Sequence, residues 1–134
     1  NRLILRSVYN VEHSVVIKEL LSGDILLLTS LWEGSPNVVK EAMACNCSVV
    51  ATNVGDISWL FGNESGHFLT TFEPVDVAAK IKQALEFSEN QGRTNGRKRI
   101  LELELDSESI ARRLAEVYEE VNNKTRFSGK QRTR

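Results

Sequence analysis

Four hydrophobic runs in the chain predict buried strands. They cover residues 3–5, 24–29 and 48–52 and, with a polar residue at each end, 67–70. The middle two runs are apolar without alternation, which is typical of strands that are covered on both faces and meet no water. This pattern predicts a sheet that lies between two layers of helices.

Apolar residues at helical spacing fill the intervals between these runs. The predicted helices cover residues 14–21, 36–44, 57–61, 76–87, 100–105 and 107–121. The residues that fit the N-cap position are Ser14, Ser35 and Asp106, since their side-chain oxygens can accept hydrogen bonds from first-turn N–H groups. Pro36 suits the first turn of its helix because proline has no N–H to leave unbonded there. The segment 100–105 also alternates like a strand toward its end, and we interpret it as helix.

Strands and helices alternate along the chain, which predicts an α/β fold: a Rossmann-like parallel sheet flanked by helices. Sheets of this kind bind ligands in the loops that follow the carboxyl ends of their strands. The loop at residues 30–35 is therefore the first place to look for a site. Gly55 and Asp56 follow the next strand, where they form either a simple turn or a second approach to the same site.

The residues that follow this first loop combine carboxylates with a helix N-terminus. Glu33 precedes the helix, and Gly34 allows a ligand to come close to the backbone. First-turn N–H groups and the helix dipole favour a phosphate or a developing negative charge. Glu41 lies about one and a half turns into the helix, on the face of Asn37. Carboxylates accept hydrogen bonds from the hydroxyls of a sugar or a ribose, so the pattern suits a nucleotide-sugar.

A structural interpretation of the two glutamates stays open at this point. A glutamate near a helix N-terminus also favours the helix dipole without any ligand. Glu41 can equally be an exposed residue or the partner of Lys40 or Lys18. Trp32 and Trp59 could stack on a base or a sugar, although we interpret them as packing residues.

A longer segment around these residues resembles the group 1 retaining glycosyltransferases of the GT-B fold. The hallmark of that family is a pair of glutamates with seven residues between them, here Glu33 and Glu41. The resemblance extends from about residue 14 to residue 121 and includes residues 24–30, 41–44, 49–52, 54–56, 66–69, 73–76 and Tyr118. It implies that the chain is a portion of the C-terminal, nucleotide-sugar-binding domain.

The resemblance also implies roles for individual residues. Glu33 would be the catalytic residue beside the donor sugar and its reacting carbon, and Glu41 would bind the ribose hydroxyls. Val11 falls where the family contacts the base through its backbone. The donor-binding backbone would comprise Gly34, Ser35, Pro36, Asn37 and Val38. The implied reaction is glycosyl transfer with retention through an oxocarbenium-like transition state, and whether Glu33 reacts or only positions the sugar stays open.

The substrates follow from the same resemblance. The donor would be a UDP- or GDP-linked sugar, and the acceptor a glycan or a lipid-linked molecule, as in the biosynthesis of a surface polysaccharide. No metal and no cofactor are implied, because a helix N-terminus and basic side chains neutralise the leaving diphosphate. The acceptor would bind to an N-terminal domain that is not part of this chain, so we expect the chain alone to be inactive.

Three positions depart from the family pattern. Ser35-Pro36 replaces a common Phe-Gly, and because Pro36 has no N–H, one donor to the diphosphate is absent. Asn46 stands where glycine is usual, and asparagine tolerates a left-handed turn better than most residues. Ser48 replaces a common proline at the start of a strand.

Composition and charge narrow the classes of protein that remain. The chain has 134 residues, of which 41% are hydrophobic and 26% charged, as in a single globular domain. A net charge of −1 argues against nucleic acid as a partner. Cys45 and Cys47 lack the paired spacing of a zinc site, and we interpret them as reduced packing residues. Because the sequence shows no export signal, we expect a cytoplasmic protein.

The chain divides into two parts by composition. We predict a partial nucleotide-sugar-binding domain over residues 1–123 and a basic, disordered tail over residues 124–134. The tail holds five basic residues and no acidic one, so weak peripheral contact with anionic lipid head groups at the inner face of the membrane is a further expectation. The chain starts at Asn1 rather than Met, which we interpret as a cut inside a longer protein.

Three alternative functions share the GT-B architecture. A nucleotide-sugar epimerase would release free sugar without an acceptor. A glycogen-type phosphorylase would need a lysine that carries pyridoxal phosphate. A non-catalytic binding module would keep the fold but bind no nucleotide, even in the full-length protein.

Overall fold

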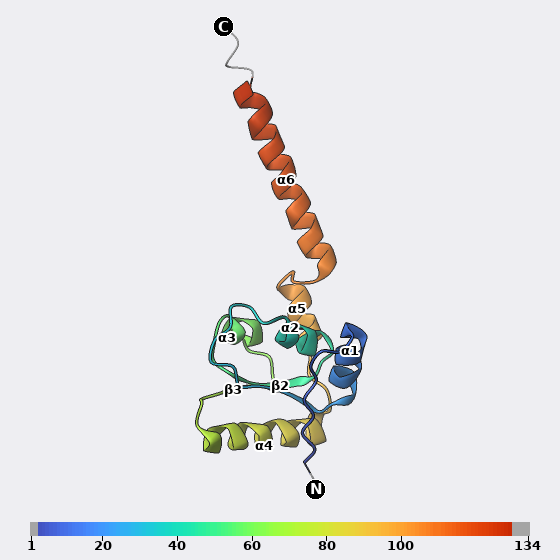
Figure 1. Cartoon of the computed structure of the whole chain (residues 1–134), viewed down its shortest axis with the longest axis vertical. Coiled ribbons are helices and arrows are strands. Elements are labelled where there is room, and N and C mark those ends of the chain that lie inside the picture. The colour runs from blue at the N-terminus through green and yellow to red at the C-terminus, as the bar shows by residue number, and fades with distance from the viewer. Residues whose placement is uncertain (1–2, 130–134) are drawn as a thin grey trace. The chain divides into compact units, whose positions relative to one another are not determined.

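The computed structural model describes residues 3–129 of the chain, which divides into two compact units, Asn1–Ile100 and Leu101–Arg134. The first unit holds a three-stranded parallel sheet with the strand order β1-β2-β3 (Figure 1). Its strands are β1 (Ile25–Leu28), β2 (Ser48–Thr52) and β3 (His67–Thr70). The predicted parallel α/β fold and the three later strands are thus confirmed.

The central strand of this sheet is β2. Leu26 of β1 pairs with Val49 of β2, and Ala51 of β2 pairs with Leu69 of β3. All five residues of β2 are buried, whereas β1 and most of β3 are half-buried. A strand with neighbours at both edges and helices on both faces does not meet water, so β2 is apolar without alternation.

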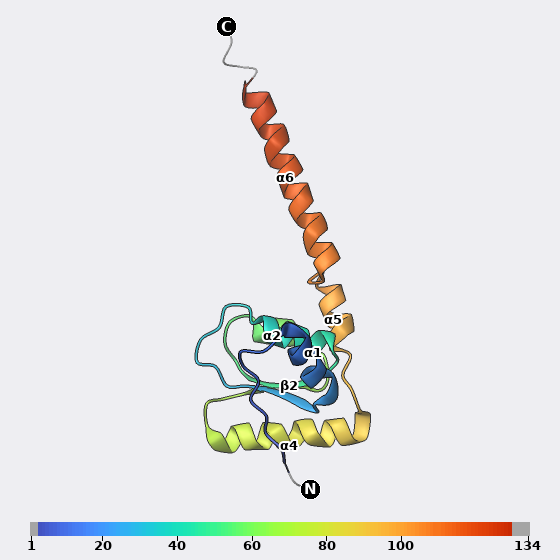
Figure 2. The ribbon, with the colours of Figure 1, turned by 45° about the vertical axis from the view of Figure 1, so that its right-hand side comes forward.

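Helices cover both faces of the sheet. α4 (Pro74–Gln91) lies along one face, and the other face carries α1 (His13–Ser22), α2 (Asn37–Ala44) and α3 (Ile57–Phe61) (Figure 2). The last helix to begin in this unit is α5 (Gly96–Glu102). Fully buried side chains between the layers belong to Val39, Met43, Val49, Val50, Ile57 and Leu60.

The predicted N-caps of α1 and α2 are wrong. Glu12 and Pro36 occupy the two N-cap positions, and neither makes a side-chain cap bond. Ser14 lies inside the first turn of α1, and the Ser35 hydroxyl bonds to a residue in another loop. Neither serine caps its helix, because α1 begins one residue before Ser14 and α2 begins two residues after Ser35.

An arginine from the loop before α5 closes the last turn of α1. The Arg93 guanidinium donates to the carbonyl oxygens of Leu20 (2.9 Å), Leu21 (2.6 Å) and Gly23 (2.7 Å). Carbonyl groups at a helix C-terminus lack partners within the helix, and a positive charge is favourable at that end of the dipole. One side chain therefore joins residues that lie 70 to 73 positions apart in the sequence.

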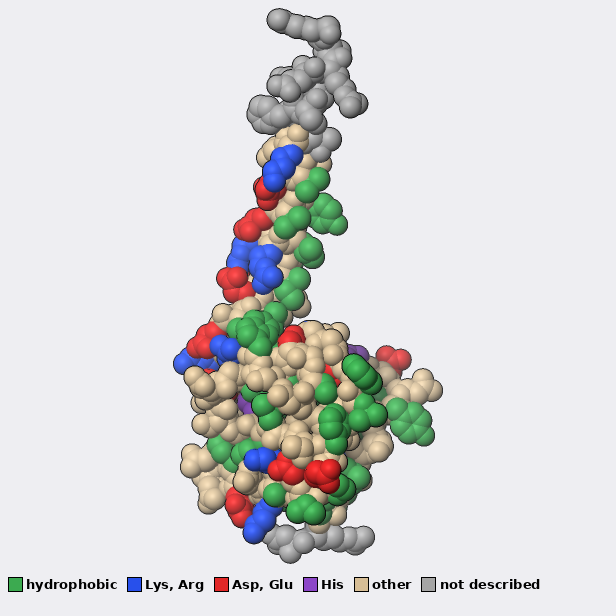
Figure 3. Space-filling model, turned by 90° about the vertical axis from the view of Figure 1, so that its left-hand side faces the viewer, with side chains coloured by type: hydrophobic (Ala, Val, Ile, Leu, Met, Phe, Trp, Pro, Cys, Tyr) green, Lys and Arg blue, Asp and Glu red, His purple; other side chains and the backbone are tan. Residues whose placement is uncertain are grey.

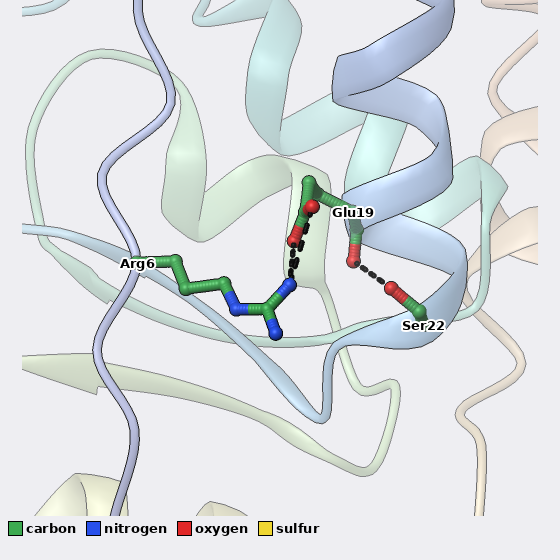
Figure 4. A network of polar contacts seen from close by, with 3 residues as sticks. All are labelled: Arg6, Glu19 and Ser22. Atoms are coloured by element: carbon green, nitrogen blue, oxygen red, sulfur yellow. Dashed lines mark hydrogen bonds and ion pairs between the residues drawn. The ribbon is translucent and has the colours of Figure 1, made fainter.

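Residues 3–11 form no helix or strand, so the predicted strand at residues 3–5 is wrong. Leu3, Ile4 and Leu5 are 61–74% exposed, and no strand among residues 3–129 pairs with them. An apolar run needs a neighbouring strand to satisfy its backbone groups, and this segment has none there. An ion pair holds the segment to α1, where Arg6 Nη1 lies 3.2 Å from Glu19 Oε2 (Figure 4).

The second unit is built on α6 (Ser107–Gly129). Asp106 caps this helix as predicted, because its Oδ1 accepts a hydrogen bond from Ser109 N (3.0 Å), and the same bond lowers the pKa of the Asp106 carboxyl. Apolar side chains gather along one side of α6 (Figure 3). No helix among the described residues combines the length and the apolar composition needed to cross a membrane.

The chain between α5 and α6 departs from the predicted helix at residues 100–105. α5 ends at Glu102, and Glu104 has a φ of +53°, which a right-handed helix does not accommodate. Only the first half of the predicted segment is therefore helical. The predicted tail begins at residue 124, within α6, and its residues 130–134 lie outside the described part of the chain.

Candidate functional site

The loops after β1 and β2 lie side by side at the carboxyl edge of the sheet. Thr52 Oγ1, at the end of β2, donates to the carbonyl oxygen of Ser30, just beyond β1 (2.7 Å). Further along the two loops, Asp56 N donates to the carbonyl oxygen of Gly34 (3.0 Å). The loop that carries Glu33 therefore lies against the loop after β2, at the edge where parallel sheets bind ligands.

Gly55 allows these two loops to make backbone contact. A Cβ atom at this position would lie 2.2 Å from the carbonyl oxygen of Gly34 and 2.8 Å from that of Glu33. The backbone φ of Gly55 is +58°, which is also strained for residues with a side chain. Glycine at this position therefore sets how closely the two loops approach.

A side-chain bond joins the same two loops. Ser35 Oγ donates to Asp56 Oδ2 at 2.5 Å, a length typical of a hydroxyl bonded to a carboxylate. The second oxygen, Asp56 Oδ1, is buried and has no hydrogen-bond partner among the described residues. Gly55 and Asp56 therefore form a turn that also lies close to the loop that carries Glu33.

The first turn of α2 carries a positive charge. Lys40 Nζ lies 3.3 Å from the carbonyl oxygen of Ser35 and 3.3 Å from Asn37 Oδ1. Pro36 is buried at the N-cap position and offers no N–H. The remaining first-turn amides, together with Lys40, form a group that can neutralise an anion.

The two predicted glutamates differ in their partners. Glu41 Oε1 lies 3.1 Å from His13 Nε2 of α1, and the Glu41 side chain is 30% exposed. His13, rather than Lys18 or Lys40, is thus the partner of Glu41 in the fold. Glu33 is half-buried, and its carboxylate has no hydrogen bond or ion pair within residues 3–129. It is therefore available to a ligand without breaking a contact of the fold.

Most of the other predicted site residues are open to solvent. Val11, just ahead of α1, is exposed, and the donor-loop residues divide into the exposed Gly34, Ser35 and Asn37, the half-buried Val38 and the buried Pro36. Trp32 is 89% exposed, so its interpretation as a packing residue is wrong. Trp59 is exposed as well. A large aromatic side chain one residue before Glu33 is thus open to a base or a sugar.

Comparison with known proteins identifies the family. The model of the group 1 glycosyl transferases matches residues 5–87, a stretch that holds both glutamates and both loops of the site. The chain belongs to the group 1 glycosyltransferases. This finding agrees with the family resemblance of the sequence and with the parallel sheet flanked by helices.

Two kinds of curated relatives are similar to the chain. One is the protein named as the teichuronic acid biosynthesis glycosyltransferase TuaC of Bacillus subtilis (strain 168): it is 49% identical over 72 residues, which cover 54% of this chain and 18% of TuaC. The other is the phosphatidylinositol N-acetylglucosaminyltransferase GPI3 subunit of Saccharomyces cerevisiae, 26% identical over 115 residues, which cover 85% of this chain and 25% of GPI3. The matched stretch is at most 25% of either relative. No solved structure gives a significant match.

Sequence reasoning left three neighbours of the site unassigned. His13 carries no local signal, because its contact with Glu41 spans 28 positions. Lys40 was considered only as a partner of Glu41, although it bonds around the first turn of α2. For Asp56, the position after a strand leaves a simple turn and an approach to the site equally open.

Proposed function

We propose that the chain binds the nucleotide-sugar donor of a retaining glycosyltransferase at the carboxyl edge of its sheet. The observation that carries this proposal is the joined pair of loops. Gly34 and Ser35, which lie directly ahead of α2, both bond to Asp56 of the other loop. The arrangement leaves the Glu33 carboxylate unpartnered in the loop, and Glu41 follows as the fifth residue of α2. The first-turn amides of the helix lie between them in the chain, where a diphosphate is favoured.

Each group has a chemical task in this proposal. Glu41 accepts hydrogen bonds from the ribose hydroxyls, and Glu33 accepts them from the donor sugar and lies next to its anomeric carbon. The backbone of Val11 contacts the base. The diphosphate is bound by Lys40 and by the backbone of Gly34, Ser35, Asn37 and Val38, while Pro36 fixes the start of the helix.

The proposed reaction transfers a hexosyl group with retention at the anomeric carbon. The bond between that carbon and the diphosphate oxygen breaks, the acceptor oxygen bonds to the same face, and the acceptor proton passes to the diphosphate. The carbon has oxocarbenium character in the transition state. Negative charge develops on the diphosphate at that moment, and the start of α2 with Lys40 stabilises it there.

The names of the relatives support a pathway for this activity. TuaC is named for teichuronic acid biosynthesis and GPI3 for a phosphatidylinositol N-acetylglucosaminyltransferase. We extend this to a UDP- or GDP-linked donor and a glycan or lipid-linked acceptor of surface polysaccharide biosynthesis, at the cytoplasmic face of a membrane. We expect these 134 residues alone not to transfer sugar, because none of the residues in this proposal binds the acceptor.

A titration of the isotope-labelled chain with UDP, GDP and ADP tests the donor site. We expect amide shifts in residues 33–39 for one of the nucleotides, and Glu41→Ala should weaken its binding at least about tenfold because a charged acceptor is lost. Glu116→Ala is the matched control, because it removes an exposed carboxylate of α6 and should leave the affinity unchanged.

Two outcomes would contradict parts of this proposal. If no nucleotide shifts any amide in this chain or in the full-length protein, the non-catalytic binding module becomes the better description. If the 134-residue chain alone transfers sugar to an acceptor, the expected inactivity of the chain is wrong.

A further inference from the structure

Asp56 is bonded twice to the loop that carries Glu33. Its N–H donates to the carbonyl oxygen of Gly34 (3.0 Å), and its Oδ2 accepts from Ser35 Oγ (2.5 Å). The residue before it, Gly55, approaches the same loop so closely that no Cβ atom fits between them. Asp56 thus bonds two consecutive residues of the other loop, and Gly55 lies close to the backbone of Glu33 and Gly34.

We propose that Asp56 is a positioning residue that holds residues 33–35 in their donor-binding conformation. This inference rests on the proposed function, because that function assigns these residues to the donor. Asp56 does not touch the donor itself and acts through Ser35 and Gly34. Its role is therefore to fix where Glu33 and the neighbouring amides lie before the donor arrives.

The length and exposure of the loop explain why it needs such a residue. Residues 29–36 connect β1 to α2, and most of them are exposed or half-buried. A loop that is free to move has to be ordered when a ligand binds, and that ordering lowers the affinity. Pro36 restricts the end of the loop by fixing its own φ. The two Asp56 bonds restrict its middle.

The Asp56 carboxylate is held in an unfavourable setting. Its Oδ1 is buried and has no partner among the described residues. An unsatisfied buried oxygen destabilises the folded state, so fold stability alone would favour a neutral side chain here. Residues that break such rules are found mainly at functional sites, where they are retained for geometry.

Two matched pairs of variants of the full chain test this role. Ser35→Val and Ser35→Thr introduce side chains of equal size, and only threonine keeps the hydroxyl; both are compatible with the extended backbone before a proline. Asp56→Leu and Asp56→Asn are also of similar size, and only asparagine keeps an acceptor oxygen. The measurements are hydrogen exchange of the position-56 amide, affinity for UDP or GDP, and urea unfolding.

The expected result is a shared loss that the conservative variants rescue. Ser35→Val and Asp56→Leu should each speed exchange at position 56 and weaken nucleotide binding about tenfold. Combining them should add no more than about twofold, because both remove the same bond. Ser35→Thr and Asp56→Asn should stay within about threefold of the wild-type affinity. If the other two variants weakened binding only by unfolding the protein, the result would not depend on the retained hydroxyl or acceptor oxygen.

Three results would overturn the inference. They are unchanged exchange at position 56 in Ser35→Val, additive losses in the double variant, and equal losses in Ser35→Thr and Ser35→Val. If the wild-type chain and the full-length protein bind neither nucleotide, the proposed function fails separately. Exchange at position 56 then still decides whether the Ser35–Asp56 bond holds the loop.

Discussion

The two ends of the sheet carry similar polar residues in different surroundings. At the amino end, Ser48, Gly66 and Thr94 are buried. At the carboxyl end, Thr52 and Thr70 are buried as well, but Gly34 and Ser35, in the loop beyond β1, are exposed. Parallel sheets bind ligands at the carboxyl end, so the difference in burial matches the difference in expected role.

Hydrogen bonds within the fold engage several polar groups of the amino end. The carbonyl oxygen of Asn46 accepts from Thr94 N (3.0 Å), and Asn46 Oδ1 accepts from Arg97 N (2.8 Å). Ser48 Oγ donates to the carbonyl oxygen of Gly66. These groups are engaged in hydrogen bonds within the fold, whereas the Glu33 carboxylate at the other end makes no such bond among the described residues. Substitution of the hydrogen-bonded groups should therefore lower stability, whereas substitution of the unpartnered Glu33 should lower donor binding.

The largest expected contrast is between two glycines. A Cβ atom on Gly96, at the amino end, would lie 2.7 Å from the carbonyl oxygen of Met43 and 2.8 Å from its Cα, whereas nothing lies within 4 Å of one on Gly34. Gly96→Ala should lower the free energy of unfolding by about 3 kcal/mol through overpacking against backbone. Gly34→Ala should change it by less than about 0.5 kcal/mol. Urea unfolding of both variants measures the difference, and equal losses in the free energy of unfolding would contradict the contrast between the two ends.

A smaller effect concerns the pH dependence of stability through His67. This residue stacks on Phe61 with ring centroids 5.0 Å apart, and neither ring nitrogen has a partner among the described residues. Burial lowers the pKa of His67 from 6.5 to about 4. The folded state therefore keeps the ring neutral while the unfolded chain takes up a proton below pH 6.5. This contribution to stability is present above that pH and is lost as the pH falls toward 4.

Unfolding at pH 7.5 and pH 5 isolates this contribution. About 2 kcal/mol of the wild-type difference between the two pH values should disappear in His67→Leu. His13→Leu is the control, because it removes the chain's other histidine and retains His67. The assignment is wrong if His67→Leu keeps the full wild-type difference.

The smallest effect on stability is expected at Glu33. Its carboxylate makes no hydrogen bond or ion pair within residues 3–129, so Glu33→Gln should change the free energy of unfolding by less than about 0.5 kcal/mol. Asp76→Asn is the comparison, because Asp76 Oδ2 accepts bonds from Thr71 N (2.7 Å) and Thr70 Oγ1 (3.1 Å), and these bonds lower its pKa. That variant should lower stability, and a larger loss in Glu33→Gln would contradict the proposed division of roles.

Periodicity predicted the elements whose pattern is local. The apolar runs of β1 and β2 and the short helix α3 lie where the sequence places them. In β2, burial on both faces leaves an unbroken apolar run. Asn46 has the left-handed φ, +55°, that its position in place of glycine suggests. The run at residues 3–5 has the same composition as a strand, but pairing depends on a neighbour, and composition does not supply one.

The candidate site was indicated by the sequence only in part. Glu33 and Glu41 lie in one loop and one helix, and the pair was singled out by this local pattern together with the family resemblance. Their neighbours Asp56 and His13 come from other elements, 21 and 28 positions away from their partners. No pattern within a short window of the sequence indicates such contacts, because they depend on how the elements pack.

Arg93 has a consequence for how the first unit is made. The carbonyl groups that it bonds belong to residues 20, 21 and 23, and all three strands are complete in the chain by residue 70. A nascent chain that ends before residue 93 already contains all the residues of the sheet. The carbonyl groups at the end of α1 can then bond only to water. The first unit is therefore expected to reach its full stability late in synthesis, as one cooperative body, rather than strand by strand as the ribosome advances.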